Sequence, residues 1–447
     1  MPAPTSVASP EVSREDGPRL TGRSRAGRSQ AGQSQAGRSG DRRSDDRRSG
    51  TDRSGAGWPY RRGFWLVGFV FLVTMAFSAV PAPLYVLYAA RDHFGPLMIT
   101  VIFAAYAVGV IASLFLAGHL SDWLGRRRMA VIAVVVNVAS GVIFLLWPSV
   151  PGLLIARVVS GVSVGMLTAT ATAYLSELDA SGRGGLSRRR AEISATAANL
   201  GGIGLGPLVA GFLAQYAGDP LVVPYLVVEA LMLAGLLGLA FVPETVTRPA
   251  VRPRYRPQRV SVPVQHRPAF YAASAIAAVS FALFGLFTSL APGFIGGTLH
   301  DPSHALAGAA TFAVFGAAAL AQIVVSRVPL RRQLALGLAA LVLGLALVTA
   351  AFWLASLALL LVGGVLAGSG AGATFKGSVT TVLGIARPEA RGEALAGLFL
   401  AGYVGLAVPV IALGVATQLL SARVAVLGFA VLLVGVVALV SRRLLKQ

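Results

Sequence analysis

Long apolar stretches alternate with short polar ones from Phe64 almost to the end of the chain. About 20 apolar residues cross the core of a bilayer as a helix, and these stretches are long enough. Helices are expected, because lipid offers backbone groups no outside partner and the stretches are too long for barrel strands. The pattern predicts twelve transmembrane helices, over residues 64–88, 98–118, 129–147, 152–173, 191–215, 221–242, 270–292, 305–326, 333–351, 354–376, 394–416 and 424–441.

Polar segments divide these helices into two groups of six. Residues 1–62 are near-repeats of Arg, Ser, Gly and Gln, which cannot bury enough apolar surface to fold. The stretch 243–268 is rich in Pro and Arg, as linkers are. The predicted organisation is a disordered tail over 1–62, a six-helix bundle over 63–242, a linker over 243–268, a second bundle over 269–441 and a short tail over 442–447.

The two halves also look like copies of each other. Adding 201 to the residue number maps Arg190 to Arg391, and Glu192 to Glu393. Gly201 and Gly204 match Gly402 and Gly405 at the same offset. In the preceding helix an offset of 203 maps Gly161 to Gly364 and Gly165 to Gly368, and so pairs Arg157 with Leu360. Each match means little in so apolar a chain, but together they indicate an internal duplication.

The basic residues alternate between the loops in a way that predicts orientation. One set of loops holds nearly all of them, including Arg126 to Arg128 and Arg188 to Arg190, whereas the opposite set holds only Arg91 and Arg423. Positively charged loops stay in the cytoplasm. Both termini and the linker are therefore expected on the cytoplasmic side of a bacterial inner membrane.

Composition agrees with a membrane protein and excludes several other classes. The 447 residues are 55% hydrophobic and only 13% charged, about half the charged fraction of soluble proteins. The net charge of +20 follows membrane topology and gives no reason to expect nucleic acid. The chain has no cysteine, which excludes disulfides and thiolate chemistry. The preference for Arg over Lys is typical of a GC-rich bacterial genome.

The loop between the second and third helices carries the most specific motif. It reads GHLSDWLGRRR and begins at Gly118. This loop resembles the signature G-x-L-x-D-x-x-G-R-[KR] of the major facilitator superfamily. The resemblance implies two pseudo-symmetric six-helix bundles around a central cavity that opens to alternate sides. It also implies a gating role, in which the acid braces the two halves, for Gly118, Asp122, Gly125, Arg126 and Arg127.

Two charged residues lie inside predicted helices. Arg157 stands a turn and a half into the fourth helix, where a charge costs roughly 2.5–3.5 kcal/mol. Its surroundings resemble the family's R-x-x-x-G pattern. Glu229 stands about 12 Å below the outer face in the sixth helix, at about 1.5 Å per residue. Desolvation favours its neutral form, so Glu229 and Arg157 are candidates for proton coupling. Snorkelling of Arg157, and a passive vestibule position for Glu229, remain open.

The fifth helix contains NLGGIGLGPLVAG, which resembles a glycine and proline motif of proton-coupled antiporters in the same superfamily. Small residues allow close helix crossing, and proline allows bending. A simple packing role is the alternative. The predicted helix-packing hinge consists of Gly202, Gly206, Pro207 and Gly211.

These features predict a secondary transporter that exports a small hydrophobic or cationic compound, as multidrug antiporters do, in exchange for protons. A sugar or metabolite importer of the same fold is the alternative, and a membrane sensor or scaffold that uses the tail is an alternative of another class. A monomer is expected. The predicted cavity-lining residues are Asn137, Asn199, Phe281, Phe284, Gln322 and Tyr403.

Enzyme signatures are missing from the sequence. We find no GxxxxGK[ST] phosphate loop, no G-x-S-x-G elbow and no HExxH motif. The nearest group of possible metal ligands, His300, Asp301 and His304, lacks further ligands at metal spacing. We therefore expect no enzyme activity, no cofactor and no metal.

Overall fold

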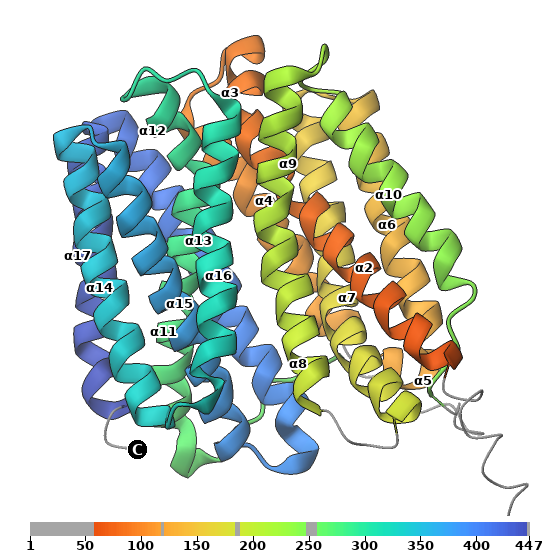
Figure 1. Cartoon of the computed structure of the whole chain (residues 1–447). Helices are drawn as coiled ribbons and strands as arrows, with labels where there is room; N and C mark the ends of the chain where they lie inside the picture. Colours follow the sequence, from red (N-terminus) through yellow and green to blue (C-terminus); the bar gives the residue numbers. More distant parts are fainter. Residues whose placement is uncertain (1–57, 118–119, 184–187, 247–256, 445–447) are drawn as a thin grey trace, which may run out of the picture. The chain divides into compact units, whose positions relative to one another are not determined.

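The computed structural model describes residues 58–117, 120–183, 188–246 and 257–444. All of them belong to one compact unit, which spans residues 52–447. Within these ranges the chain forms helices and no strands (Figure 1). The predicted all-α fold class is therefore confirmed.

Eleven helical segments of the described residues are long and apolar enough to cross a membrane, and α10 is a shorter apolar helix of 17 residues. At about 1.5 Å per residue α10 is about 26 Å long, close to the thickness of the hydrocarbon core. The N-terminal half contains α2 (Trp58–Ala79), α3 (Pro81–Asp92), α4 (Pro96–Ala117), α5 (Ser121–Leu124), α6 (Arg126–Leu146), α7 (Val150–Arg183), α8 (Arg188–Thr196), a π-helical turn (Ala197–Gly201), α9 (Gly202–Tyr216) and α10 (Val223–Leu239).

The C-terminal half begins with a 3₁₀ turn at Val264–His266 and repeats the same plan. Its helices are α11 (Arg267–Ser289), α12 (Ala291–Gly297), α13 (His304–Val324), α14 (Leu330–Leu354), α15 (Leu357–Ile385), α16 (Arg391–Leu419) and α17 (Ala422–Leu444). With α10, the eleven candidate spans of the described residues are consistent with the twelve crossings that the apolar pattern predicts.

The first crossing of each half is broken into two helices, which the pattern of apolar residues does not reveal. In the N-terminal half the break between α2 and α3 falls at Val80, just before Pro81. In the C-terminal half α11 and α12 meet at Leu290, with Pro292 in the first turn of α12. Proline has no N–H to donate and is favoured in the first turn of a helix, so it begins a new helix here.

Several boundaries differ from the sequence expectation. Helix α2 begins at Trp58, so residues 58–62 are helical although they were assigned to the tail. Helix α11 begins at Arg267, inside the predicted linker. Long basic side chains can reach outward from a helix end, so helices continue past the apolar stretch. Residues 1–57 of the predicted tail, 247–256 of the linker and 445–447 lie outside the described residues.

Buried apolar side chains form two clusters, one in each half. The first runs from Phe64 to Val242 and is joined by Leu406 and Val410 of α16. The second runs from Phe270 to Val437. The halves meet where α4 packs on α16 and α9 packs on α13, and α9 and α13 lie side by side in Figure 1.

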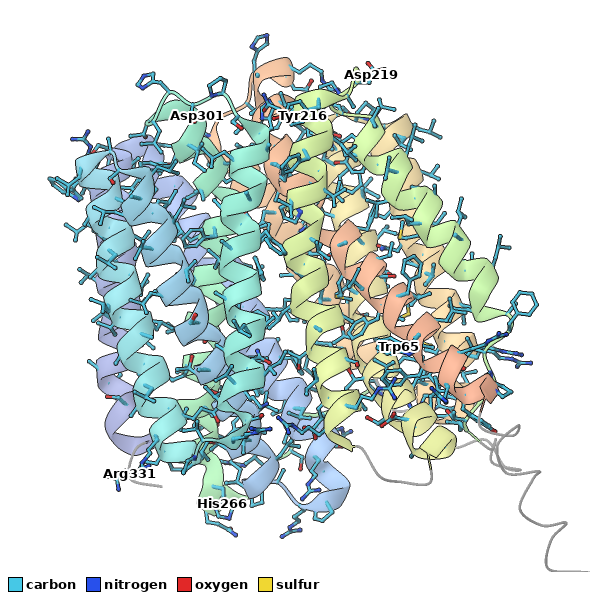
Figure 2. All side chains as sticks on the ribbon, viewed as in Figure 1. Trp65, Tyr216, Asp219, His266, Asp301 and Arg331 are labelled. Carbon is cyan, nitrogen blue, oxygen red and sulfur yellow. The ribbon has the colours of Figure 1, made fainter. Side chains whose placement is uncertain are left out.

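The two ends of the helices differ in charge. We call the end that carries Arg126, Arg190 and Arg331 the arginine-rich end. It is the lower end in Figure 2, where Arg331 and His266 are labelled, while Asp219 and Asp301 mark the opposite end. Helices α3 and α12 lie at the opposite end and contact each other.

Candidate functional site

The loop at Asp122 forms an ion-pair network at the arginine-rich end. The Arg126 guanidinium contacts Asp122 one turn away (Nη1 to Oδ1, 2.6 Å) and Glu177 of α7 (Nη2 to Oε1, 2.9 Å). Asp122 is 63% exposed, whereas the Arg126 side chain is mostly buried. Arg126 is therefore the centre of the network, and Gly118 lies outside the described residues.

Glu244, which is not among the predicted site residues, completes this network. Its carboxylate accepts the backbone N–H of Arg126 at 2.8 Å and that of Arg127 at 3.2 Å. The first N–H groups of a helix have no partner within the helix. Here the Glu244 carboxylate, from a distant segment of the chain, accepts the hydrogen bonds of two of them. Gly125, at φ +99°, lets the backbone turn directly against that carboxylate. The signal in the sequence was the Pro-Glu-Thr that follows the sixth apolar stretch.

These contacts all lie within the N-terminal half. The pairs of Asp122 and Arg126 involve α5, α6 and α7 only, so a brace between the two halves by Asp122 stays a prediction. Glu177 and the Arg188 to Arg190 run were plausible partners in sequence, because they flank one loop. Among the described side chains, Glu177 pairs with Arg126, and Arg190 pairs with Asp179 at 3.6 Å.

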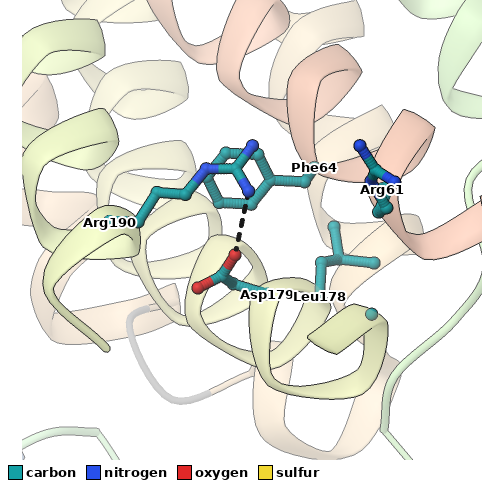
Figure 3. Close-up of a pocket in the computed structure, with 6 residues that line it drawn as sticks. Arg61, Phe64, Leu178, Asp179 and Arg190 are labelled. Atoms are coloured by element: carbon teal, nitrogen blue, oxygen red, sulfur yellow. Dashed lines mark ion pairs between the residues drawn. The ribbon is translucent and has the colours of Figure 1, made fainter. Parts of the chain in front are cut away.

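Arg190 also lies over the Phe64 ring, 4.7 Å from its centroid, and ties α8 to α2 and α7 (Figure 3). The hollow around it is about 170 Å³ including open solvent, and it leaves no room for a water molecule. The other best-formed pocket of the described residues, beside Phe287 and Phe352, is of the same size. Ligand sites usually exceed about 300 Å³, so neither pocket fits a substrate.

Arg157 lies buried where α7 faces α2 and α4. Its Nη1 donates to the carbonyl oxygen of Ser78 at 2.5 Å. Its guanidinium lies 4.5 Å from the Tyr106 ring centroid and 5.7 Å from that of Phe103. Cations are attracted to aromatic faces, and burial strengthens that attraction. The side chain is 2% exposed, so Arg157 does not snorkel to the surface.

Glu229 lies in a different place, between α10 and α6. Its carboxylate lies against Gly141, and neither of its oxygens has a hydrogen-bond partner. One turn from Gly141, the Asn137 side-chain amide faces the carbonyl of Thr74 and the sulfur of Met232. The Asn137 Oδ1 and Thr74 Oγ1 atoms are also unpartnered. Unpaired polar atoms of three helices therefore gather in the interior of the N-terminal half.

Arg157 and Glu229 do not contact each other. No hydrogen bond or ion pair joins these two described side chains, and Arg157 lies on the side of the bundle toward α4. The two regions are linked through one turn of α2, because the carbonyl of Thr74 faces Asn137 and that of Ser78 accepts from Arg157. Asn137, one of the predicted cavity residues, is buried inside the N-terminal half.

The glycines of α9 allow two helices to approach its backbone. On one side, a methyl group at Gly202 would crowd the Leu72 carbonyl of α2. A methyl group at Gly206 would overlap the carbonyl of Ala76 one turn along. The spacing of four residues therefore fits close packing of α9 on α2.

The other side of α9 packs across the boundary between the halves. A methyl group at Gly211 would overlap the carbonyl of His304, the first residue of α13. The Pro207 carbonyl lies directly against Gly308 of the same helix. These contacts account for Gly202, Gly206 and Gly211 as packing residues, and bending at Pro207 stays a prediction.

Aromatic residues of the C-terminal half face Tyr106. The Tyr403 ring lies 6.2 Å from the Tyr106 ring and 5.2 Å from the Phe281 ring, centroid to centroid. Phe284 stacks on Phe315 of α13 at 4.7 Å. Three of the predicted cavity residues thus belong to a connected aromatic cluster, and Tyr403 contacts the helix that supports Arg157.

Asn199 and Gln322 are the remaining predicted cavity residues. Asn199 belongs to the π-helical turn, which contacts both α2 and α13. Such turns often occur at functional sites. Gln322 accepts a hydrogen bond of 2.8 Å from Lys376 through its backbone carbonyl.

Comparisons with known proteins agree with this geometry. Residues 66–349 match the model of the Major Facilitator Superfamily. The structure is similar to that of the human organic anion transporter MFSD10 (TETRAN), at 18% identity and a TM-score of 0.63, over 86% of this chain and 99% of that one. It is also similar to the nucleoside transporter NupG, at 14% identity with the same TM-score and coverage.

No curated protein matches the sequence. At 18% and 14% identity the two solved structures establish the fold alone. The family model covers more than half of the 447 residues, and its match begins in α2 and ends in α14. The chain therefore belongs to the Major Facilitator Superfamily and is a multi-pass membrane transporter rather than an enzyme.

Proposed function

We propose that this chain is a proton-coupled secondary transporter that exports a small, largely apolar organic compound by alternating access. It acts as a monomer in a bacterial inner membrane, with the arginine-rich end and both termini in the cytoplasm. The excess of arginine at that end supports the orientation. The resemblance of the α9 motif to proton-coupled antiporters supports export.

The observation that carries proton coupling is the environment of Glu229. The residue is 6% exposed, and both carboxylate oxygens lack partners. An ionised carboxylate without a partner is very costly to bury, so the protonated form is the one this packing favours. A conformation that admits water to Glu229 would let the proton leave.

The turn of α2 between Thr74 and Ser78 supports a link from this proton to the substrate path. It has Asn137 and the Glu229 region on one side and Arg157 on the other. Helix α2 ends at the break before Pro81, where α3 begins and reaches the C-terminal half. Movement of this turn would therefore alter the contacts of Asn137 near Glu229 and the contact of Arg157 at the same time.

Of the two substrate classes expected from the sequence, the apolar one fits better. Arg157 is buried against Tyr106, whose ring faces Tyr403 of the other half, and its charge would repel a cation. The aromatic cluster of Phe281, Phe284 and Tyr403 favours an apolar ligand.

The test uses the purified full chain in proteoliposomes loaded with a pH-sensitive dye. A panel of aromatic acids, amides and amines is added from outside, and compound-dependent proton flux is recorded. We expect flux with wild type and none with Glu229→Gln, which keeps the shape of the side chain. Unchanged proton flux in Glu229→Gln would show that Glu229 takes no part in proton coupling.

The matched control is Asp219→Asn, at an exposed loop position of the opposite end. It should leave the flux unchanged. Inverted vesicles check the direction: accumulation of a compound under an inside-acid gradient supports export. Uptake into vesicles of the natural orientation would instead support the importer.

An importer of a polar metabolite is the second candidate. Asn199 supports it, because its π-helical turn contacts both halves and its amide can hydrogen-bond a hydroxyl group. Substitution to Ala would then reduce uptake of the metabolite and leave proton flux with apolar compounds unchanged.

A further inference from the structure

Arg157 is a buried cation without an anionic partner. Its contacts are the Ser78 carbonyl and the rings of Tyr106 and Phe103, and its Nε atom has no hydrogen-bond partner. Among the described residues no Asp or Glu forms an ion pair with it. Buried charges are normally paired, so this arrangement calls for a counter-charge from outside the chain.

Two further buried hydroxyl groups of the N-terminal half have no hydrogen-bond partner. The Tyr85 hydroxyl is buried and unpartnered, and it interacts electrostatically with Arg157. Ser160, one turn along α7, is also buried with an unpartnered hydroxyl. An arginine fork and hydroxyl donors together match a carboxylate, which accepts several hydrogen bonds.

The internal duplication argues against a purely structural role for Arg157. The sequence offset of 203 pairs Arg157 with Leu360 of α15, which is 1% exposed in the apolar core. The second half therefore folds without a charged residue at this position. Arg157 is added to one half only, beside the boundary with α16.

We propose that Arg157, with Tyr85, binds the carboxylate of an amphipathic organic anion whose apolar body lies against the aromatic cluster. This inference rests on the proposed transport function and names its substrate class. The ligand enters when α4 and α16 separate at the contact between Tyr106 and Tyr403. In the present conformation that contact and the 2% exposure of Arg157 close the site.

The test measures binding to the purified full chain in detergent, by thermal unfolding and by equilibrium dialysis. The probes are 2-naphthoate, its neutral amide 2-naphthamide and sodium chloride, all at neutral pH. We expect 2-naphthoate to bind and to raise the unfolding temperature, and the other two to have no effect. Equal effects of naphthoate and naphthamide, or of chloride, would overturn the proposal, as would the absence of any naphthoate effect.

The variants identify the site. Arg157→Leu copies the second half and should weaken naphthoate binding at least about 30-fold, because loss of one partner of a buried charge pair has effects of that size. Tyr85→Phe removes an unpartnered hydroxyl and should weaken binding several-fold with unchanged folding. Arg331→Leu, at an exposed position, is the control and should bind as wild type.

Two further variants keep the test decisive. If Arg157→Leu fails to fold, Arg157→Lys keeps the charge and loses the planar fork, and it should still weaken binding. Wild-type affinity in Arg157→Lys and in Tyr85→Phe would overturn the proposal. Glu229→Gln should retain naphthoate binding, so loss of proton coupling and loss of anion binding are separate outcomes.

Discussion

The carboxylate of Glu244 accepts a 2.8 Å hydrogen bond from the backbone N–H of Arg126, a residue 118 positions away in the sequence. It also accepts the N–H of Arg127, and so caps the start of α6. The segment after the sixth crossing thereby holds the loop between the second and third. The network at the arginine-rich end of the N-terminal half depends on this contact as well as on its ion pairs.

We expect Glu244→Ala to destabilise the protein by about 1 kcal/mol, the usual effect of removing a helix cap. The measurement is the midpoint of thermal unfolding of the purified protein in detergent. Asp219→Ala, at an exposed loop position, should leave the midpoint unchanged. Equal midpoints for Glu244→Ala and wild type would show that water replaces the cap at no cost.

Gly125→Ala should be more harmful than its size suggests. The backbone at Gly125 has φ +99°, and a Cβ there would overlap the Glu244 carboxylate. Such conformations cost a non-glycine residue of order 1–3 kcal/mol. The unfolding midpoint should therefore fall, whereas Gly428→Ala, in an open helical position, should leave it unchanged or raise it slightly. A larger loss at Gly428 would contradict this reasoning.

Arg126 and Asp122 should contribute unequally to stability. Asp122 is 63% exposed, and exposed ion pairs contribute about 0–1 kcal/mol. Arg126→Gln, by contrast, leaves Glu177 without its guanidinium and removes the donor to Ser121. Chemical denaturation should rank Arg126→Gln well below Asp122→Asn, with Asp122→Asn near wild type. The reverse order would mean that Asp122 is the main partner in the network.

Gly211→Leu should force the halves apart at the end opposite the arginine-rich end. A side chain there overlaps the backbone of His304, so α9 and α13 could not keep their present contact. Because the chain has no cysteine, Ser289→Cys, 3% exposed in wild type, provides a single reporter. We expect faster maleimide labelling of this cysteine in the Gly211→Leu background. Unchanged labelling, as expected for Gly428→Leu, would show that this contact does not control access.

Several sequence predictions rested on local features and agree with the structure. The apolar lengths predicted all twelve crossings, since each helix must match the bilayer by itself. Pro81 and Pro292 can also be located in the sequence. A uniformly apolar stretch does not indicate whether a proline will bend the helix or begin a new one. In the structure each first crossing consists of two consecutive helices joined at one residue, Val80 or Leu290, which keeps right-handed helical backbone angles.

The partners of charged residues could not be read from spacing. Glu177 lies near Arg188 to Arg190 in sequence, yet it pairs with Arg126, and Asp179 takes Arg190. A helix presents neighbouring residues to different sides, so two positions along α7 are enough to change the partner. The role of Glu244 could not be predicted for the same reason. Its partners are backbone N–H groups at the start of α6, which only the fold brings close to it.

By itself the sequence determined that this chain crosses a membrane, how often it does so, which end carries the arginines and which superfamily motif lies in the first basic loop. Each of these depends on lengths, composition or consecutive residues. The tertiary structure alone decided that Arg157 faces aromatic rings beside the boundary between the halves and that Glu229 lies apart from it. Helix rotation decides such placements, and in helices that are apolar on every side the sequence carries no periodicity from which to read it.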